Sequence, residues 1–526
     1  MRKRKRVLAA LLAFMYLLLT GCGIDAGTGH QESNDIISDA VPDNLAASVN
    51  TFGLAYQPEE GLNPYTCTSM TNRTIISLLY ESLFTVTSEF AVEPVLCESF
   101  SVSDDLLSCT VHIMKDTKFS DGSPLTAGDV VASYRAAAGS AVYGSRYYAI
   151  SGVEALDDTT VVFHTILPYE NLTLLLDLPI VKAGSVGQDC PIGSGPYQLL
   201  TERHTNNLIH NDYWWQGTYD CVINAQNIRL VQTDTPTEVR DDFEYGVTGV
   251  VCTDPNSSSY VDYHCDYELW NCSTTIMDYI GFNVQTGLFC LTDLRVALTN
   301  LIDRDAIATE LYHGFAEPAV LPASPLSSVY DKTLAQTYSY RPEEFSKGVA
   351  ATSARGSSAT FLVCSSDPRR VATAERIAQA AAEYGIELVV EAVGERTFQN
   401  RLYQGDYELY LGEVRLSPTF DLTQFFNGGT LCYGGIGSDT LVESCREALK
   451  NSGNMRSLHS TIMSYGLICP ILFKSYAVYA TRGIIGNMYP ALDNVFYTSD
   501  GRTLSDTLVI RTPDEVTEED QEPEEG

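Results

Sequence analysis

The sequence predicts an α/β protein built from several compact units. It has 526 residues, more than one ordinary hydrophobic core holds, so roughly two to four units are expected. Strand-like and helix-like segments alternate along the chain. The clearest alternation is a strand-like segment at 359–364, an Ala-rich helical segment at 370–384 that stops before Gly385, and a second strand-like segment at 387–392. This order predicts a right-handed βαβ unit in a mixed sheet.

The other elements follow from local hydrophobic periodicity. One helical pattern has apolar positions that extend to Leu83, and a second is expected to be capped by Thr126, with Asp129 in its first turn. Short alternating or β-rich runs predict strands. The segments are 72–83 and 129–138 for the helices, and 107–113, 161–166 and 228–233 for the strands.

Composition and charge narrow the class of protein. Hydrophobic residues make up 44% of the chain, with 31 Tyr and 19 Phe, so the chain buries enough apolar surface to order itself and general disorder is excluded. Acidic residues outnumber basic ones 67 to 33, which gives a formal charge of −34. Nucleic acid and anionic membrane surfaces repel such a protein, so neither is an expected partner.

The N-terminus has the pattern of an export signal. Met1–Arg6 is basic, and the apolar run at 7–19 is shorter than the ~20 residues of a membrane-spanning helix. The sequence Leu-Thr-Gly-Cys that ends at Cys22 resembles the bacterial lipobox. We therefore expect a lipoprotein signal peptide at 1–21 and a lipid on Cys22, which anchors the protein to the cell membrane facing outside the cytoplasm. The alternative is a plain signal peptide with a chance cysteine.

Both ends of the mature chain are expected to be flexible. Residues 22–47 are rich in Gly, Ser, Asp and Asn without hydrophobic periodicity, which is typical of a tether. Residues 513–526 are strongly acidic and contain no base, which indicates a solvated, disordered tail. A docking or metal-binding role is the alternative for the tail.

The cysteines and the absent motifs argue against metal and catalytic chemistry. Beyond Cys22 there are 13 cysteines, with no CxxC and no zinc-finger spacing. We expect mostly free thiols, with one or two disulfides within 252–290 left open. GxSxG, HExxH, P-loop and GxGxxG motifs are absent. The sequence therefore predicts no cofactor, no metal site and no enzyme.

A series of ordered motifs then resembles one protein family. The most specific runs from Lys118 to Ser133 (KFSDGSPLTAGDVVAS), and others follow in order along nearly the whole mature chain. They resemble the family 5 extracellular solute-binding proteins, the peptide- and nickel-binding receptors of ABC importers. The remaining motifs are Leu62-Asn63-Pro64, Leu79–Leu83 (LYESL), Glu93–Leu96 (EPVL), Phe100–Asp105 (FSVSDD), Gly193–Tyr197 (GSGPY), Asn211–Trp214 (NDYW), Asp293–Leu298 (DLRVAL), Ile302–Arg304 (IDR), Gly314–Ala316 (GFA) and Gly405–Glu408 (GDYE).

The resemblance implies a two-lobed α/β clamp of the periplasmic-binding-protein type, class II, with a subdomain inserted in lobe I. Lobe II interrupts lobe I in the sequence, so the lobes share crossover strands and close on a ligand. The implied segments are 48–82, 189–272 and 470–512 for lobe I, 83–188 for the insertion, and 273–469 for lobe II.

The resemblance also focuses the search for ligand-binding residues. In many peptide-binding members, the segment that follows the Gly405–Glu408 motif has an Asp four residues before a Pro, and that Asp holds the ammonium group of the peptide. Here the Pro is Pro418, and the residue four positions before it is Val414. Glu413 and Arg415 flank Val414 and project from one face of a strand. Our hypothesis is that Glu413 binds an ammonium and Arg415 a carboxylate or a backbone carbonyl. The alternative is that they form salt bridges with each other or with neighbours.

Two further residues are candidates for the ligand site. Asp421 is a second possible anchor, and Tyr65 lines the cleft or packs in the core. The sequence thus predicts a monomeric, lipid-anchored receptor that captures oligopeptides and delivers them to the permease and ATPase subunits of an ABC importer. The alternatives are another solute (a nickel chelate, haem or a sugar), a signalling or structural lipoprotein that has lost transport, and, last, an exported hydrolase.

Overall fold

The computed structural model describes most of the chain between residues 52 and 497. All described residues belong to the second of two units, Leu45–Gly526. The predicted signal peptide, Cys22, the tether and the acidic tail lie outside the described residues, as does Cys221. The described ranges are 52–144, 147–203, 205–216, 227–257, 260, 262–485 and 488–497.

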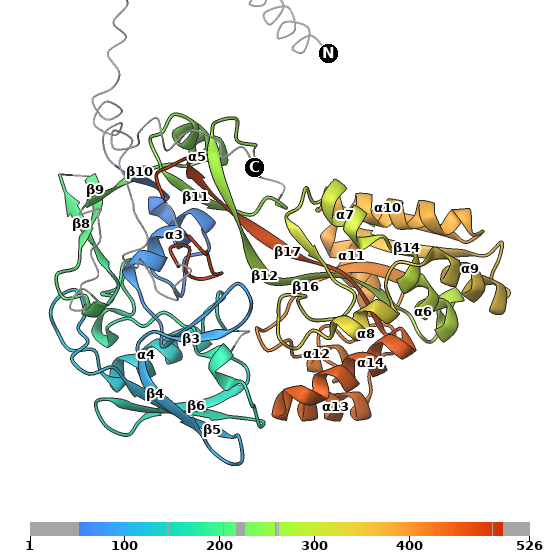
Figure 1. Ribbon diagram of the computed structural model, residues 1–526, viewed down its shortest axis with the longest axis horizontal. Coiled ribbons are helices and arrows are strands. Elements are labelled where there is room, and N and C mark those ends of the chain that lie inside the picture. The colour runs from blue at the N-terminus through green and yellow to red at the C-terminus, as the bar shows by residue number, and fades with distance from the viewer. Residues whose placement is uncertain are drawn as a thin grey trace, which may run out of the picture. The chain divides into compact units, whose positions relative to one another are not determined.

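An 11-stranded mixed sheet forms the framework of this unit (Figure 1). Its order is β15-β14-β16-β12-β17-β11-β1-β10-β9-β8, and β13 pairs with β17. The strands are β1 (Gly53–Tyr56), β8 (Tyr197–Glu202), β9 (Thr205–His210), β10 (Asn227–Gln232), β11 (Val250–Thr253), β12 (Tyr267–Phe282), β13 (Ala316–Pro318), β14 (Ser358–Cys364), β15 (Glu387–Val393), β16 (Leu409–Arg415) and β17 (Ile468–Thr481).

Two long antiparallel strands join the two lobes. β12 has 16 residues and β17 has 14, and they pair from Tyr267↔Thr481 at one end to Gly281↔Ile468 at the other. β11 of lobe I pairs with the C-terminal half of β17, whereas β16 of lobe II pairs with the C-terminal half of β12. In Figure 1 the ribbon formed by β12 and β17 runs from one lobe into the other. The lobes therefore share backbone hydrogen bonds.

Lobe I and the insertion share one hydrophobic core, which contains Leu54 and Val250 of the large sheet together with Val111 and Phe163 of the inserted sheet. The inserted sheet has the order β4-β5-β7-β6 and is antiparallel. The elements are β2 (Phe84–Val86), β3 (Val92–Pro94), β4 (Cys97–Val102), β5 (Ser108–Ile113), β6 (Ile150–Ala155), β7 (Thr160–Thr165), α3 (Met70–Leu79), α4 (Ala127–Ala138), α5 (Pro236–Glu244), and the short 3₁₀ helices η1 (Pro58–Glu60), η2 (Leu172–Leu175) and η3 (Ala183–Ser185).

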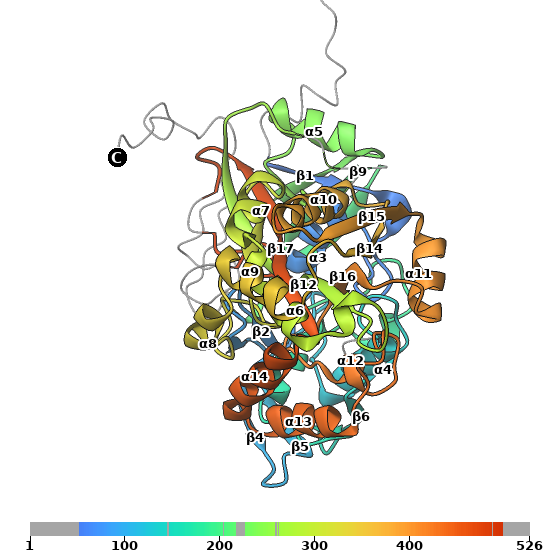
Figure 2. The same ribbon diagram turned by 90° about the vertical axis from the view of Figure 1, so that its right-hand side faces the viewer.

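Lobe II buries both faces of its part of the sheet. Along β14, Phe361 and Val363 join one hydrophobic cluster and Leu362 and Cys364 join another, as expected for a central strand whose side chains alternate between two covered faces. The helices are α6 (Thr292–Leu301), α7 (Arg304–Glu310), α8 (Lys332–Thr337), α9 (Pro342–Ala351), α10 (Pro368–Glu383), α11 (Glu395–Gln404), α12 (Thr423–Phe426), α13 (Asp439–Lys450), α14 (Met455–Tyr465), and the 3₁₀ helices η5 (Leu288–Cys290) and η6 (Ser452–Asn454). Figure 2 shows α13 and α14 on the same side of the large sheet as the inserted strands β4–β6.

The predicted βαβ unit is confirmed. It consists of β14, α10 and β15, and the two strands pair in parallel from Ser358↔Glu387 to Cys364↔Val393. Strands at 108–113, 160–165 and 227–232 are confirmed as well. At the start of α4, the Asp129 carboxylate accepts hydrogen bonds from the Thr126 backbone and hydroxyl. That contact fixes the helix N-terminus as expected.

The prediction that the first helix continues to Leu83 is wrong. α3 ends at Leu79, and Tyr80 is extended. The reason is tertiary: the loop at 193–195 packs so closely on the end of the helix that a Cβ atom at Gly193 would lie 2.0 Å from the Leu79 carbonyl oxygen. The Tyr80 hydroxyl donates to backbone oxygens of Leu62 and Pro191, which hold the chain in its extended path.

Within the described part of the chain, no helix has both the length and the apolar character that a membrane crossing requires.

Candidate ligand-binding cleft

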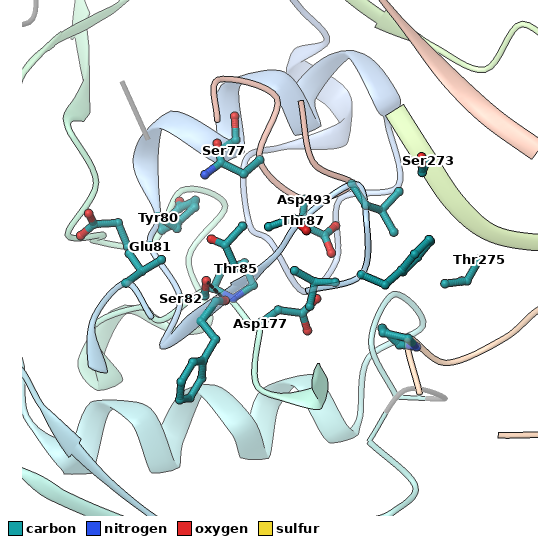
Figure 3. Close-up of a pocket in the computed structure, with 18 residues that line it drawn as sticks. Ser77, Tyr80, Glu81, Ser82, Thr85, Thr87, Asp177, Ser273, Thr275 and Asp493 are labelled. Carbon is teal, nitrogen blue, oxygen red and sulfur yellow. Dashed lines mark hydrogen bonds between the residues drawn. The ribbon is translucent and has the colours of Figure 1, made fainter. Parts of the chain in front are cut away.

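Three adjoining cavities lie between the lobes, and two of them are lined in part by the ribbon of β12 and β17. Pro418, in the lobe II loop after β16, lines all three. We name them by their lining. The central chamber (Figure 3) contains Asp177, and the basic chamber contains Arg73 and Arg415, while Asp493 lines both of these chambers. The neutral chamber lies between the insertion and lobe II.

The basic chamber brings together cations from both lobes. Arg73 comes from α3 of lobe I and Arg415 from β16 of lobe II, and the cavity volume between the walls is about 290 Å³. The Arg415 guanidinium donates from Nη2 to the Tyr476 hydroxyl at 2.7 Å. It forms no salt bridge with any residue that the structure describes, whereas Arg73 lies 3.6 Å from Asp493. Arg415 is therefore an exposed cation without a carboxylate partner in the part of the chain that the structure describes.

Glu413 belongs to an ionic cluster at the shared strands. Its Oε2 lies 2.6 Å from Nζ of Lys474 on β17. Lys474 is only 4% exposed, and it also lies 3.0 Å from the Asp367 carboxylate and 3.9 Å from that of Asp278. The arrangement matches the alternative that the sequence left open, a salt bridge with a neighbour. Whether Glu413 also binds a ligand ammonium stays a prediction.

The pKa values within this cluster reflect burial and mutual attraction. Burial alone would lower the pKa of Lys474, but Asp278, Glu413 and Asp367 outweigh it and raise the pKa above its ordinary value. Burial raises the pKa of Asp278 to about 6 although Lys474 opposes the shift. For Asp367, Lys474 and Arg370 overcome the effect of burial and lower the pKa. The cluster is thus a buried cation held by three carboxylates.

Asp421 forms a hydrogen bond across the cleft rather than facing open solvent. One carboxylate oxygen accepts the backbone N–H and the hydroxyl of Thr423 at 2.9 and 2.6 Å. The other accepts the hydroxyl of Tyr148, which belongs to the insertion. The structure therefore places this predicted anchor in a contact between lobe II and the insertion.

Three more contacts join the insertion to lobe II. The Glu170 backbone N–H donates to the Leu449 carbonyl oxygen at 2.9 Å, and its carboxylate accepts the Ser452 N–H at 2.6 Å. The rings of Phe90 and Phe420 meet edge to face with centroids 5.1 Å apart. We call these contacts, with Tyr148–Asp421, the clasp. They hold the insertion against lobe II beside the cleft.

Tyr65 lies in the core of lobe I. It is 3% exposed, and its hydroxyl donates to the Pro179 carbonyl oxygen at 2.8 Å. Pro179 itself lines the central chamber. Tyr65 thus supports the cleft wall from behind, and a direct ligand contact stays a prediction.

Sequence reasoning missed Arg73, Asp177, Asp493 and Glu81. Arg73 is the one cation in the otherwise uncharged helix α3, which is a signal that could have found it. Neither aspartate carries a comparable signal, because both lie in loops that the fold brings to the cleft. In Figure 3, the Glu81 carboxylate points away from Asp177 and Asp493.

Glu81 is a fully enclosed carboxylate at the edge of the central chamber. It accepts hydrogen bonds from the indole nitrogens of Trp214 and Trp215 at 2.9 and 3.0 Å, and from the Ser194 hydroxyl at 3.0 Å. Burial raises its pKa to about 7 in spite of these donors. The family-like motifs that contain Glu81, Ser194 and Trp214 therefore meet in one structural contact.

The described cysteines are free thiols, including Cys252, Cys265, Cys272 and Cys290 in the segment where disulfides were left open. Among the residues that the structure describes, no group of three or more His, Cys, Asp or Glu side chains has a metal-binding arrangement.

Comparison with known proteins decides the family. A model of the bacterial extracellular solute-binding proteins, family 5 (middle part), matches residues 91–434. The chain belongs to this family. The glutathione-binding protein GsiB of Escherichia coli O1:K1 / APEC is 27% identical over 302 residues, which cover 53% of this chain and 56% of GsiB. This family 5 chain thus spans about half the length of the curated relatives it matches.

Solved structures resemble the family 5 chain over most of its length. The ABC transporter substrate-binding protein CtaP of Listeria monocytogenes has a TM-score of 0.69 at 18% identity, covering 88% of this chain and 100% of CtaP. The periplasmic murein tripeptide-binding protein MppA, in its unliganded open form, has a TM-score of 0.70 at 14% identity, covering 88% and 97%. At these identities the likeness concerns the fold, and it confirms the predicted two-lobed solute-binding architecture.

Proposed function

We propose that the protein is a lipid-anchored receptor that captures oligopeptides between its lobes and delivers them to the permease of an ABC importer, whose ATPase subunits supply the energy. The observation that carries the proposal is Arg415 in the basic chamber, opposite Arg73 of the other lobe. A ligand carboxylate between the two guanidinium groups contacts both lobes only when they are closed. Such a ligand therefore favours the closed state by differential affinity.

Peptides fit the arrangement of charges along the cleft. At Arg415 the basic chamber suits a carboxylate, and Asp177 in the adjoining central chamber suits an ammonium, whereas Asp493 lines both chambers and lies 3.6 Å from Arg73. Glu413 remains the sequence-based candidate for the ammonium, and it would have to share its carboxylate with Lys474. MppA and GsiB, whose names specify a murein tripeptide and glutathione, support a peptide-like ligand.

The test is binding of peptide pools to mature protein that lacks the lipid. A peptide present at 100 times its Kd adds about 2.7 kcal/mol to the free energy of unfolding. This shifts Tm by several degrees. Arg415→Met should abolish the shift. Arg446→Met, which changes an exposed arginine on α13, is the matched control. A peptide-induced shift that survives in Arg415→Met would contradict the proposed site.

A second candidate function is capture of an anionic solute other than a peptide, such as a nickel chelate. The presence of two guanidinium groups in one chamber, where the Asp493 carboxylate lies 3.6 Å from Arg73, favours it. A parallel panel of Ni²⁺ with chelators, haem and sugars separates the two, since only one class should shift Tm in an Arg415-dependent way. Binding of no pool by protein freed of copurified ligand would favour a lipoprotein that has lost transport.

The membrane anchor is tested separately. Cys22→Ala should release the protein from the membrane fraction and leave the N-terminus without a diacylglycerol mass increment. Retention of Cys22→Ala in that fraction would refute the lipid attachment and leave a plain signal peptide.

A further inference from the structure

The basic chamber contains a negative charge as well as its two arginines. Among the described residues that line it, the charged ones are Arg73, Arg415 and Asp493. Oδ1 of Asp493 lies 3.6 Å from Nη1 of Arg73, and the two side chains are 17% and 25% exposed, respectively. Two arginines and one aspartate give this lining a net charge of +1. The described lining therefore balances one negative charge of a ligand.

Asp493 lies at the tip of a short loop near the end of the described chain. The Tyr489 N–H donates to the Tyr497 carbonyl oxygen at 2.7 Å, and this bond closes the base of the loop. Nearer the tip, the Asn494 N–H donates to the Ala491 carbonyl oxygen at 3.1 Å. The tip reaches the cleft, so that Asp493 lines the central chamber (Figure 3) as well as the basic one.

Side chains of the same loop anchor it to lobe I and to the insertion. Met488, Val495 and Phe496 belong to the hydrophobic core that these two share, and Phe496 is fully buried. The Tyr489 hydroxyl donates to the carboxylate of Glu89, in the insertion, at 3.1 Å. A loop that is held in this way keeps its acidic tip in the chamber when a ligand enters. Its aspartate is therefore a lasting negative charge beside Arg73.

The charge of the lining distinguishes singly from doubly charged end groups. The net charge of +1 matches the first negative charge of a ligand. A second negative charge meets the Asp493 carboxylate, and it loses water without gaining a countercharge from the described lining. Repulsion between two unit charges within one small chamber changes affinity by at least about tenfold, even after partial screening by solvent and salt.

We propose that Asp493 is a specificity-determining residue, which restricts the basic chamber to end groups with a single negative charge and excludes doubly charged groups such as phosphates and phosphonates. The inference rests on the proposed function and names the charge of the end group that this chamber takes. A peptide C-terminal carboxylate meets the requirement. The restriction is independent of the side chains that the peptide carries.

The experiment varies the charge of the end group on one peptide, the tightest binder of the pools. Its C-terminal residue is replaced by β-alanine, taurine or 2-aminoethylphosphonate, which end in a carboxylate, a sulfonate and a phosphonate. Above the second pKa of the phosphonate, the sulfonate and phosphonate probes share a tetrahedral shape and differ by one charge. The ratio of their Kd values therefore isolates the effect of charge. The wild type should bind the sulfonate probe more tightly.

The ratio should follow the net charge of the lining in three variants. Asp493→Asn raises this charge to +2 and should shift the ratio at least about tenfold toward the phosphonate. Arg73→Gln lowers it to 0 and should shift the ratio the other way. The double variant returns to +1 and should restore the wild-type ratio within about threefold. Asp266→Asn is the matched control, because Asp266 lies 2.9 Å from Arg482 and outside the chamber lining.

A purely structural role of the loop would weaken all three probes alike, whereas the proposed role moves the ratio. An identical ratio in the wild type and the three variants, or a ratio that the double variant does not restore, would overturn the inference. Binding of the parent peptide but of neither tetrahedral probe would overturn it as well. If Arg415→Met abolishes binding of the β-alanine probe while the ratio ignores the charge of the lining, the inference fails and the proposed function stands. If neither the parent peptide nor any probe binds, both fail.

Discussion

The hydrogen bond from Tyr148 to Asp421 should control ligand affinity without touching ligand. It joins the insertion to lobe II, and in an open form both groups would face water. A hydrogen bond to a charged acceptor contributes about 1.5–3 kcal/mol, and because Tyr148 is 40% exposed we expect the lower end. Tyr148→Phe should therefore shift the closed-to-open ratio by about 1.5 kcal/mol, or roughly tenfold.

Isothermal titration calorimetry with the tightest peptide measures this effect. Tyr148→Phe and Asp421→Asn should each raise Kd about tenfold, and the double variant should be no worse than either one. Tyr403→Phe, at a residue that is 89% exposed on α11, should match the wild type. Small-angle scattering of the free protein should show a larger radius of gyration for Tyr148→Phe. A Kd within twofold of the wild type, or additive effects in the double variant, would refute the clasp as a determinant of closure.

Three further predictions concern stability. Burial raises the pKa of Glu81 to about 7, so the folded state loses up to about 3 kcal/mol of stability as pH rises from 4.5 to 7. Glu81→Gln should flatten that part of a Tm-against-pH curve. An unchanged slope in the variant would contradict this assignment to Glu81. Burial lowers the pKa of His459 to about 4, so the stability that is present above pH 6.5 is lost as pH falls to 4. His459→Leu should remove that loss. A Tm-against-pH curve identical to that of the wild type between pH 6.5 and 4 would contradict this prediction. Lys474→Met leaves a buried cluster of carboxylates without its central cation, so it should lower the free energy of urea unfolding by about 3–5 kcal/mol. Adding Asp278→Asn should restore part of this loss. A loss below about 1 kcal/mol would show that Arg370 alone stabilises the carboxylates.

The sequence predicted correctly those elements whose limits are set by residues within the same segment. The βαβ unit at β14–α10–β15 has its period, its N-capping Asp367 and its stop before Gly385 all within one segment, and it is confirmed. The end of α3 was beyond such reasoning, because it is set by the Gly193 loop, more than a hundred residues away. The resemblance supplied the fold through motifs that meet in space, such as Glu81 with Trp214.

The candidate site was predictable only in part, for the same reason. Periodicity placed Glu413 and Arg415 on one face of a strand, and both reach side chains of β17, Lys474 and Tyr476. Those partners lie 61 residues further along the chain. Sequence alone could not decide which of the two charges the protein would neutralise internally. The structure pairs Glu413 and leaves Arg415 without a carboxylate partner among the described residues.

The position of β17 near the end of the chain has a consequence for biosynthesis. Lobe I needs Val478 and Ala480 in its core and pairs β11 with β17, whereas lobe II needs Leu472 and Phe473 of the same strand. During synthesis, several hundred residues emerge before either lobe has its central strand, so both wait for contacts between distant parts of the sequence. Completion of either lobe late in synthesis would suit the export that the N-terminal sequence predicts. A chain cut before residue 468 would complete neither lobe.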